Sequence, residues 1–128
     1  MRHLSAGAAT AVWFLILAPA AFADSVDLGA AEAQFKKSCG TCHVALADAG
    51  PRQGPNLFGV VGRKAGSVPG FAYSAQFMAG DSAIVWDEGT LDRWITDPQS
   101  VIPGATMPYK QADPDKRHLV IEYLKTRH

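Results

Sequence analysis

Two cysteines and a histidine stand close together in the run Cys39-Gly40-Thr41-Cys42-His43. Two cysteines separated by two residues, with histidine directly after the second, are typical of a covalent c-type haem attachment site. The two thiols add to the two vinyl groups of a haem, and the imidazole of His43 is then placed to bind the iron as an axial ligand. The sequence therefore predicts one haem c, attached through Cys39 and Cys42, and one-electron iron chemistry.

Three other kinds of site use a cysteine pair with this spacing. A thioredoxin-like redox pair occurs where a strand meets a helix in a βαβ unit, and the chain shows no such alternation. A structural zinc site needs four nitrogen or sulfur ligands, and after His43 only His118 and His128 follow, both at the far end. A disulfide between Cys39 and Cys42 would close a very short loop and constrain the chain little. Haem attachment is therefore the favoured interpretation.

The first 23 residues have the pattern of an export signal. A positively charged start precedes an apolar run over 11–18, and small residues follow at Ala21 and Ala23. We expect a signal peptide over residues 1–23 that is cleaved after Ala23. A retained membrane anchor is the alternative, but the apolar run is too short to span a bilayer comfortably.

Length and charge limit what the mature chain can be. Removal of 23 residues from 128 leaves 105, which suits one domain over 24–128. The chain has 12 basic and 12 acidic residues, and the leader contributes only Arg2, so the mature balance is 11 basic against 12 acidic. Nucleic acids and anionic membranes both attract strongly basic surfaces. The near-neutral balance therefore argues against both kinds of partner, and no further apolar stretch reaches membrane length.

A helix is predicted directly before the cysteine pair. Asp27 is a good N-cap, and apolar residues at helical spacing run from there to about Lys37 or Ser38. Cys39 and Cys42 continue the apolar face, so this helix is expected to deliver the haem site on its buried side. The residues expected on that face are Leu28, Ala31 and Phe35.

After the cysteine pair, the sequence predicts a long loop followed by two short helices. Residues 50–70 are rich in glycine and proline, which is typical of loops. A short helix is expected around 74–78. Another begins after the cap Asp87 and is expected to stop at Pro98, because the residue before a proline disfavours helical geometry. The residues of this helix expected to face inward are Leu91, Trp94 and Ile95.

The last helix has a clear start. Asp113 is a good N-cap, and Pro114 suits the first turn, where its missing N–H is not needed. No segment shows a convincing strand pattern, so the predicted fold is all-α. The residues expected on the buried face of this helix are Leu119, Val120, Tyr123 and Leu124.

A haem bound by one histidine has a second axial position, and the mature chain offers two methionines for it. Met107 lies between Pro103 and Pro108, which hold its loop extended and stiff. A stiff loop is suited to hold a soft thioether on iron, so Met107 is the predicted sixth ligand. Met78, at the end of a short helix, is the second choice. The alternative role for either methionine is packing in the core.

Several runs of residues, in order along the chain, carry a resemblance to a known family. They are Gln34–His43, Gly54–Lys64, Pro69–Ser74, Val85-Trp86, Ile102–Met107 and Tyr123–Lys125. With these runs the chain resembles the class I c-type cytochromes, in particular mitochondrial cytochrome c and its short soluble bacterial relatives. The order also fits, because the four-helix-bundle c-type cytochromes have their attachment site near the C-terminus. The resemblance implies a small all-α cytochrome c fold wrapped around one haem.

The resemblance gives four more residues a role at the haem. It implies that Pro55 offers its carbonyl oxygen to the far nitrogen of His43. It implies that Tyr73 and Trp86 turn their O–H and N–H groups toward a buried haem propionate. Arg63 would lie near the same propionate and partly compensate its charge. From residue type alone, the alternatives are core packing for the aromatic residues and a solvated loop charge for Arg63.

Two further expectations come from the resemblance. Phe35 and Tyr123 are expected to meet where the first and last helices cross. Trp94 stands where mitochondrial relatives have a tyrosine that donates a hydrogen bond to the methionine sulfur. At that position the indole either donates to Met107 from another angle or only fills space.

The function implied by the resemblance is electron transfer rather than enzymatic catalysis. We expect a periplasmic carrier that passes single electrons between respiratory or photosynthetic complexes, through a haem ligated by His43 and Met107. Docking to redox partners is expected to be brief and at the haem edge, by a monomer without permanent membrane insertion. One alternative is a haem enzyme or sensor with a labile sixth position. The other is a dedicated cytochrome subunit of a periplasmic dehydrogenase.

Overall fold

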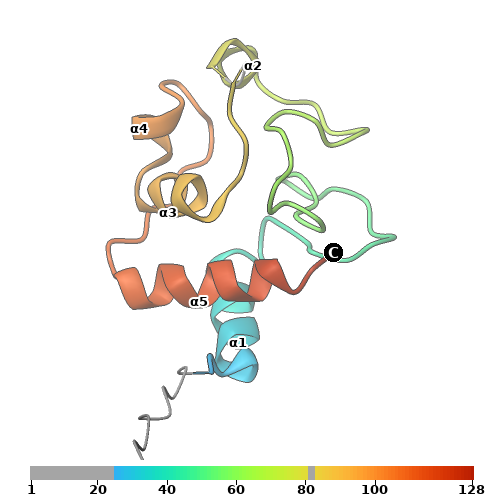
Figure 1. The fold of residues 1–128 in the computed structure, drawn as a ribbon. Coiled ribbons are helices and arrows are strands. Elements are labelled where there is room, and N and C mark those ends of the chain that lie inside the picture. The colour runs from blue at the N-terminus through green and yellow to red at the C-terminus, as the bar shows by residue number, and fades with distance from the viewer. Residues whose placement is uncertain (1–24, 81–82) are drawn as a thin grey trace, which may run out of the picture.

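The computed structural model describes residues 25–80 and 83–128, so the predicted signal peptide over 1–23 lies outside the described residues. Within them the helices are α1 (Leu28–Ser38), α2 (Ala75–Gly80), α3 (Glu88–Thr96), α4 (Pro98–Val101) and α5 (Pro114–Lys125). Figure 1 shows α1 and α5 crossing at one end, α3 and α4 side by side, and the long loop between α1 and α2 on the other side. The all-α prediction is confirmed.

Helix α1 begins where the sequence predicts. The carboxylate of Asp27 accepts hydrogen bonds from the backbone N–H groups of Gly29 and Ala30 and so caps the first turn. The predicted burial of Leu28 is wrong, because its side chain is 54% exposed. The buried face starts at Ala31, since α5 crosses α1 nearer to the C-terminal end of α1 (Figure 1).

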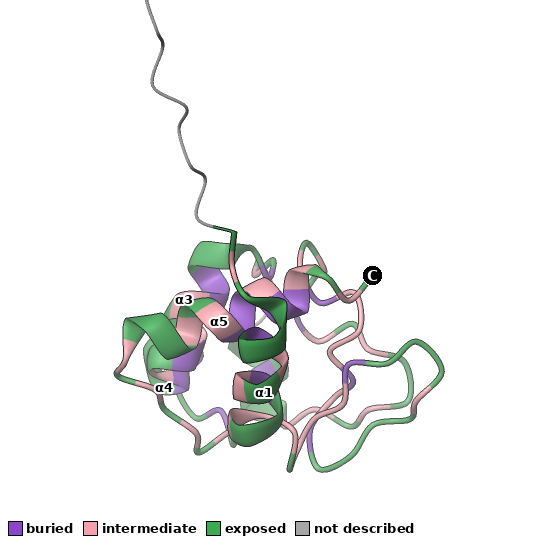
Figure 2. Cartoon of the chain, turned by 90° about the horizontal axis from the view of Figure 1, so that it is seen from below, coloured by how far each residue is buried: buried purple, intermediate pink, exposed green. Residues whose placement is uncertain are grey.

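Helices α1 and α5 meet through an aromatic pair. The rings of Phe35 and Tyr123 stack with their centroids 4.6 Å apart, which confirms the expected contact. Three of the four residues predicted to be buried on α5 are buried, whereas Leu119 is only half-buried and Ile121 is buried in addition. The buried face is wider than predicted because α5 packs against both α1 and α3. Figure 2 shows the buried residues gathered where these helices meet.

The other predicted caps are also present. The side chain of Asp87 accepts from the backbone N–H of Thr90 at 2.6 Å and starts α3. Asp113 accepts from the backbone N–H groups of Asp115 and Lys116 and starts α5. Each cap satisfies donors that a helix leaves open in its first turn.

Asp97 separates α3 from α4. Its backbone is extended, with φ −158° and ψ 103°, as the following proline favours. The predicted stop of this helix at Asp97 and Pro98 is confirmed, because α3 ends at Thr96. The sequence did not predict that Pro98 also opens the short helix α4, where a proline fits the first turn. The Asp97 carboxylate caps α4 by accepting from the backbone N–H of Gln99 at 3.0 Å. Helix α4 then leads directly into the loop that carries Met107.

Two loop segments pair in antiparallel fashion, which the sequence did not predict. Lys64 and Val85 form an isolated bridge. The backbone N–H of Trp86 donates to the carbonyl of Arg63, and that of Gly62 donates to the carbonyl of Trp86, both at 2.9 Å. This pairing fixes Arg63 and Trp86 beside each other.

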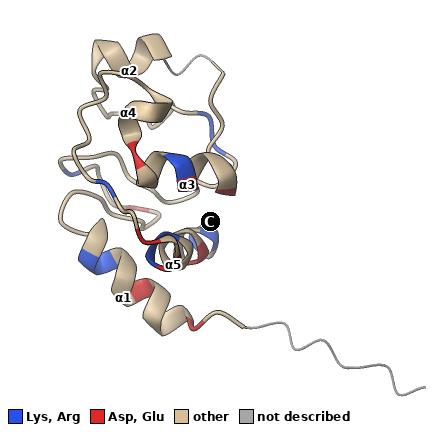
Figure 3. Ribbon diagram, turned by 90° about the vertical axis from the view of Figure 1, so that its left-hand side faces the viewer, with Lys and Arg blue, Asp and Glu red and all other residues tan. Residues whose placement is uncertain are grey.

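The surface carries mixed charge. Helices α1, α3 and α5 each have both basic and acidic residues, which are interspersed in Figure 3. In the ranges 25–80 and 83–128, no helix is both long enough and apolar enough to cross a membrane.

Candidate haem site

One cavity of about 760 Å³ collects eight of the residues that the sequence singles out for the site. These residues come from the end of α1, from the loops on either side of α2, and from the loop after α4. Met78, the second choice as a ligand, is 46% exposed and does not line the cavity. The predicted site residues in its wall are Cys39, Cys42, His43, Pro55, Arg63, Tyr73, Trp86 and Met107.

Cys39 and Cys42 lie in a tight turn at the end of α1. The backbone N–H groups of Cys42 and His43 both donate to the carbonyl of Cys39, at 3.1 and 2.9 Å. No disulfide joins the two cysteines. Burial raises the pKa of the Cys39 thiol to about 12, and the neighbouring Cys42 adds to this. Thiols that attack disulfides have a lowered pKa, so Cys39 is unsuited to be the nucleophile of a thioredoxin-like pair.

The imidazole of His43 has one defined tautomer. Its Nδ1 lies 2.8 Å from the carbonyl oxygen of Pro55, which confirms the predicted contact. Because a carbonyl only accepts, Nδ1 carries the hydrogen and Nε2 of the neutral ring keeps its lone pair. Burial lowers the pKa of His43, and the hydrogen bond to Pro55 opposes this in part. The ring is therefore neutral and ready to bind a metal ion through Nε2.

Gly54 lies against the same ring, and the sequence pattern assigned it no role. An added Cβ would lie 2.6 Å from Nδ1 of His43 and 2.8 Å from Nε2, closer than real side chains come. Only glycine therefore leaves room for the imidazole in this orientation. The backbone N–H of Gly54 also donates to the carbonyl of Cys42 at 2.8 Å and ties the loop to the cysteine turn. In the sequence, only the position of Gly54 directly before Pro55 could have indicated that it lies near His43.

The sulfur of Met107 accepts a hydrogen bond from the indole N–H of Trp94, with Nε1 and Sδ 3.2 Å apart. Trp94 therefore donates a hydrogen bond to Met107 and does not only fill space, which decides between the two alternatives left open by the sequence. The indole contacts Phe77 and Trp86 edge-on, with ring centroids 5.8 and 5.2 Å away, and these contacts hold the donor in place. The hydrogen bond orients the thioether and uses one of its two lone pairs, so the other is available for a metal ion.

Arg63 is half-buried and brings a positive charge to the cavity wall. Its Nη1 and Nη2 donate to the carbonyls of Phe58 and Asn56, at 2.7 and 2.9 Å. Its Nε is buried and has no hydrogen-bond partner among the described residues. Burial lowers the pKa of the guanidinium, and the nearby Tyr73 hydroxyl opposes this in part. A buried donor without an acceptor is suited to an anionic group.

Comparison with known proteins gives the family. No family model matches the chain. The chain is 41% identical over 103 residues to cytochrome c-550 of Novispirillum itersonii, which covers 73% of this chain and 93% of that protein. It is 38% identical over 100 residues to cytochrome c of Sesamum indicum, which covers 77% and 88%. The chain belongs to the class I c-type cytochromes. The resemblance seen in the sequence is therefore confirmed.

A further relative extends this comparison. Over 96 residues the cytochrome is 42% identical to cytochrome c2 of Rhodomicrobium vannielii, which covers 74% of this chain and 75% of that protein. Members of this family transfer electrons and carry covalent haem c, so the cofactor of this cytochrome is haem c and its function is electron transfer.

The cavity of the cytochrome fits this cofactor. The cysteine turn and the imidazole of His43 are the groups that would attach a haem and bind its iron, and Nε of Arg63 would be a donor for a propionate. Tyr73 and Trp86 lie beside Arg63 in the same wall, and the Tyr73 hydroxyl accepts from the backbone N–H of Val68 at 3.3 Å. Their orientation toward a propionate stays a prediction.

Proposed function

We propose that the cytochrome is a periplasmic carrier that shuttles single electrons between respiratory or photosynthetic redox complexes. The bound haem c supplies reversible one-electron chemistry at its iron. Cys39 and Cys42 hold the haem through thioether bonds, while Nε2 of His43 and the sulfur of Met107 act as axial ligands. This ligand pair raises the reduction potential relative to two histidines.

One observation carries the proposal: both proposed ligands line one cavity, and each is already oriented by a hydrogen bond. The Pro55 carbonyl holds the ring of His43, and the Trp94 indole holds the sulfur of Met107. Because the fold itself holds both side chains, they need to move little when an electron arrives or leaves. Little rearrangement favours fast transfer.

The same arrangement favours a carrier over an enzyme. With Met107 on the iron, no substrate reaches the metal, so we infer no enzymatic activity. Redox partners would dock briefly where the haem edge meets the surface, and the working form would be a monomer without permanent membrane insertion. The interspersed charges seen in Figure 3 support weak electrostatic steering of these encounters.

Export completes the proposal. Residues 1–23 would direct the chain to the periplasm and be removed after Ala23, which leaves 24–128 as the cytochrome domain. Mass spectrometry of the exported protein tests the cleavage site directly. A mature chain that begins at Asp24 and carries the mass of one covalent haem is expected.

Protein-film voltammetry of the haem-loaded protein tests the carrier function. We expect a reversible one-electron wave at a positive potential and no catalytic current when hydrogen peroxide is added. The Met107→Ala variant serves as the positive control, because loss of the thioether opens the sixth position to peroxide. A negative potential of the wild-type protein, or a peroxide-dependent current from it, would contradict the proposal and favour a haem enzyme.

A further inference from the structure

We propose that Gln99 and Arg117 are positioning residues that hold Met107 in place, one at each end of the methionine loop (residues 102–112). The inference rests on the proposed function, in which Met107 binds the iron. Neither side chain lines the cavity, so each acts through the loop backbone.

The methionine loop begins with a tight turn. The backbone N–H of Ala105 donates to the carbonyl of Ile102 at 3.1 Å, and Gly104 has a φ of +84°. Pro103 followed by a glycine with positive φ is typical of a type II turn. Ile102 is fully buried and anchors the turn in the core.

The side-chain amide of Gln99 binds this turn with both of its polar atoms. Its Nε2 donates to the carbonyl of Ala105 at 2.6 Å, and its Oε1 accepts from the backbone N–H of Gly104 at 2.8 Å. One side chain thus satisfies a donor and an acceptor of two consecutive residues. Since α4 carries Gln99 and is capped by Asp97, the amide is held on a fixed support.

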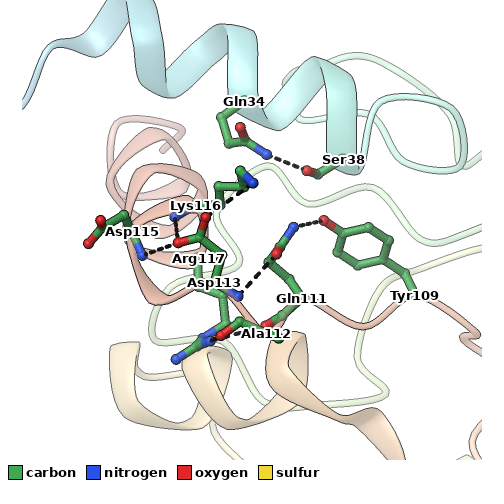
Figure 4. A network of polar contacts seen from close by, with 9 residues as sticks. All are labelled: Gln34, Ser38, Tyr109, Gln111, Ala112, Asp113, Asp115, Lys116 and Arg117. Atoms are coloured by element: carbon green, nitrogen blue, oxygen red, sulfur yellow. Dashed lines mark hydrogen bonds and ion pairs between the residues drawn. The ribbon is translucent and has the colours of Figure 1, made fainter.

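Arg117 binds the other end of the methionine loop. Its Nη1 donates to the carbonyls of Gln111 and Ala112 at 3.0 and 2.8 Å, and its Nε donates to Asp92 at 2.7 Å. Asp92 lies on α3 and Arg117 on α5, so this side chain joins the loop to two helices. Only 12% of the Arg117 side chain is exposed, and Figure 4 shows it against the loop backbone.

The side chain of Gln111 reinforces this second anchor. Its Nε2 donates to the Tyr109 hydroxyl at 2.9 Å, and its Oε1 accepts from the backbone N–H of Asp113 at 3.1 Å (Figure 4). The backbone N–H of Gln111 also donates to the carbonyl of Ile95 on α3 at 2.8 Å.

Between the two anchors the loop lacks backbone support. Residues 106–110 make no backbone-to-backbone hydrogen bond with any other described residue. Three side-chain contacts locate this span. The indole of Trp94 donates to the sulfur of Met107, and Lys110 forms an ion pair with Asp97 at 2.9 Å. The third contact is the bond from Gln111, within the second anchor, to the Tyr109 hydroxyl. A span held this sparsely opens readily, so the position of the sulfur depends on the anchors at its ends.

Imidazole affinity of the oxidised, haem-loaded protein tests the inference, because imidazole competes with Met107 for the iron. Gln99→Ala removes two hydrogen bonds, and we expect imidazole to bind it about tenfold more tightly than the wild type. Arg117→Met should show a similar gain, and Arg117→Lys a smaller one. Ser100→Ala and Lys116→Met change exposed neighbours of the two residues, and their affinities should stay within about twofold.

A second measurement separates positioning from mere stabilisation. If Gln99 and Arg117 only stabilised the fold, Gln99→Ala and Arg117→Met would lower the guanidinium midpoint of unfolding but leave the imidazole affinity of the folded protein unchanged. That result would overturn the inference. Gln99→Glu keeps the acceptor for Gly104 but loses the donor to Ala105, so its affinity should fall between wild type and Gln99→Ala. Equal affinities for Gln99→Ala and Ser100→Ala would also overturn it.

The same experiment distinguishes this inference from the proposed function. If the oxidised wild type lacks a sulfur-to-iron charge-transfer band and binds imidazole as tightly as Met107→Ala, the ligand assignment is wrong and both proposals fail. If the band is present in the wild type but Gln99→Ala and Arg117→Met bind imidazole like the wild type, only the positioning role is wrong.

Discussion

Trp94 and Met107 are joined by a hydrogen bond from the indole N–H to the thioether sulfur, across 3.2 Å and between α3 and the methionine loop. A donor at the sulfur withdraws electron density from it. With Met107 on the iron as proposed, the sulfur would then stabilise the more positive ferric iron less well, and the hydrogen bond would favour the reduced state of the cytochrome.

Trp94→Phe should therefore lower the reduction potential. The substitution keeps an aromatic ring against Phe77 and removes only the donor. One net hydrogen bond corresponds to a fall of roughly 20–60 mV for a one-electron couple. Ser38→Ala is the control, because Ser38 also lines the cavity but its hydroxyl accepts from the Gln34 side chain on α1. Voltammetry that gives Trp94→Phe the wild-type potential would show that the hydrogen bond has no effect on the iron.

Gly54→Ala should destabilise the cytochrome. The new Cβ would collide with the ring of His43, which must then move and lose its bond to Pro55. We expect the free energy of unfolding to fall by about 1–3 kcal/mol in guanidinium titrations of the haem-loaded protein. Gly50→Ala is the matched control, since no atom lies within 4 Å of an added Cβ there. Equal effects of the two changes would refute the packing argument.

The starts of the helices were predictable because capping is local. Asp27, Asp87 and Asp113 each accept from backbone N–H groups two or three residues ahead, and this pattern is visible in the sequence. The exposure of Leu28 was not predictable, because it depends on where α5 crosses α1. The start of α4 at Pro98 was also missed, since a proline stops one helix and opens another with the same geometry.

In the haem site, too, local features could be predicted from the sequence and contacts between distant segments could not. The haem motif from Cys39 to His43 is contiguous, and the prolines around Met107 are close to it, so both could be predicted from the sequence. The contacts of Gly54 and Gln99 could not be predicted, because no residue type or spacing marks them. Each depends on a loop returning to a particular side chain. From the sequence, Trp94 could either donate a hydrogen bond to Met107 or only pack in the core, and the structure shows that it donates.

Acid should remove a small part of the stability through Asp97. The hydrogen bond from Lys110 holds the pKa of Asp97 below its ordinary value of 3.8. A carboxyl whose pKa is lowered by folding stabilises the folded state at any pH above the pKa that the group has in the unfolded chain. This stability is lost as the pH falls through the lowered pKa of the folded state. Lys110→Met should therefore have a lower guanidinium midpoint than wild type at about pH 7, and the difference should vanish near pH 2.

Lys37→Met is the control for this pH dependence. Lys37 is exposed on α1 and forms no ion pair among the described residues, so its loss should change the midpoint little at any pH. A difference between Lys110→Met and wild type that persists unchanged down to about pH 2 would argue against the Asp97 contact as its source.

Salt should change the rate of reaction with a charged partner only modestly. The mature chain carries 11 basic and 12 acidic residues if the leader is removed, and its helices mix both signs. Oxidation of the reduced protein by ferricyanide, followed by stopped flow, should change by less than about threefold between roughly 0.01 and 0.1 M salt. A much steeper dependence would reveal a strongly charged docking face.

The visible spectrum of the reduced, haem-loaded protein, recorded before and after addition of carbon monoxide, tests the central claim most directly. With His43 and Met107 both on the iron, carbon monoxide has no free position, and the spectrum should stay unchanged. Met107→Ala should bind carbon monoxide readily under the same conditions. Ready binding by the wild type would mean an open or labile sixth position, and it would contradict the account of this cytochrome as a simple electron carrier.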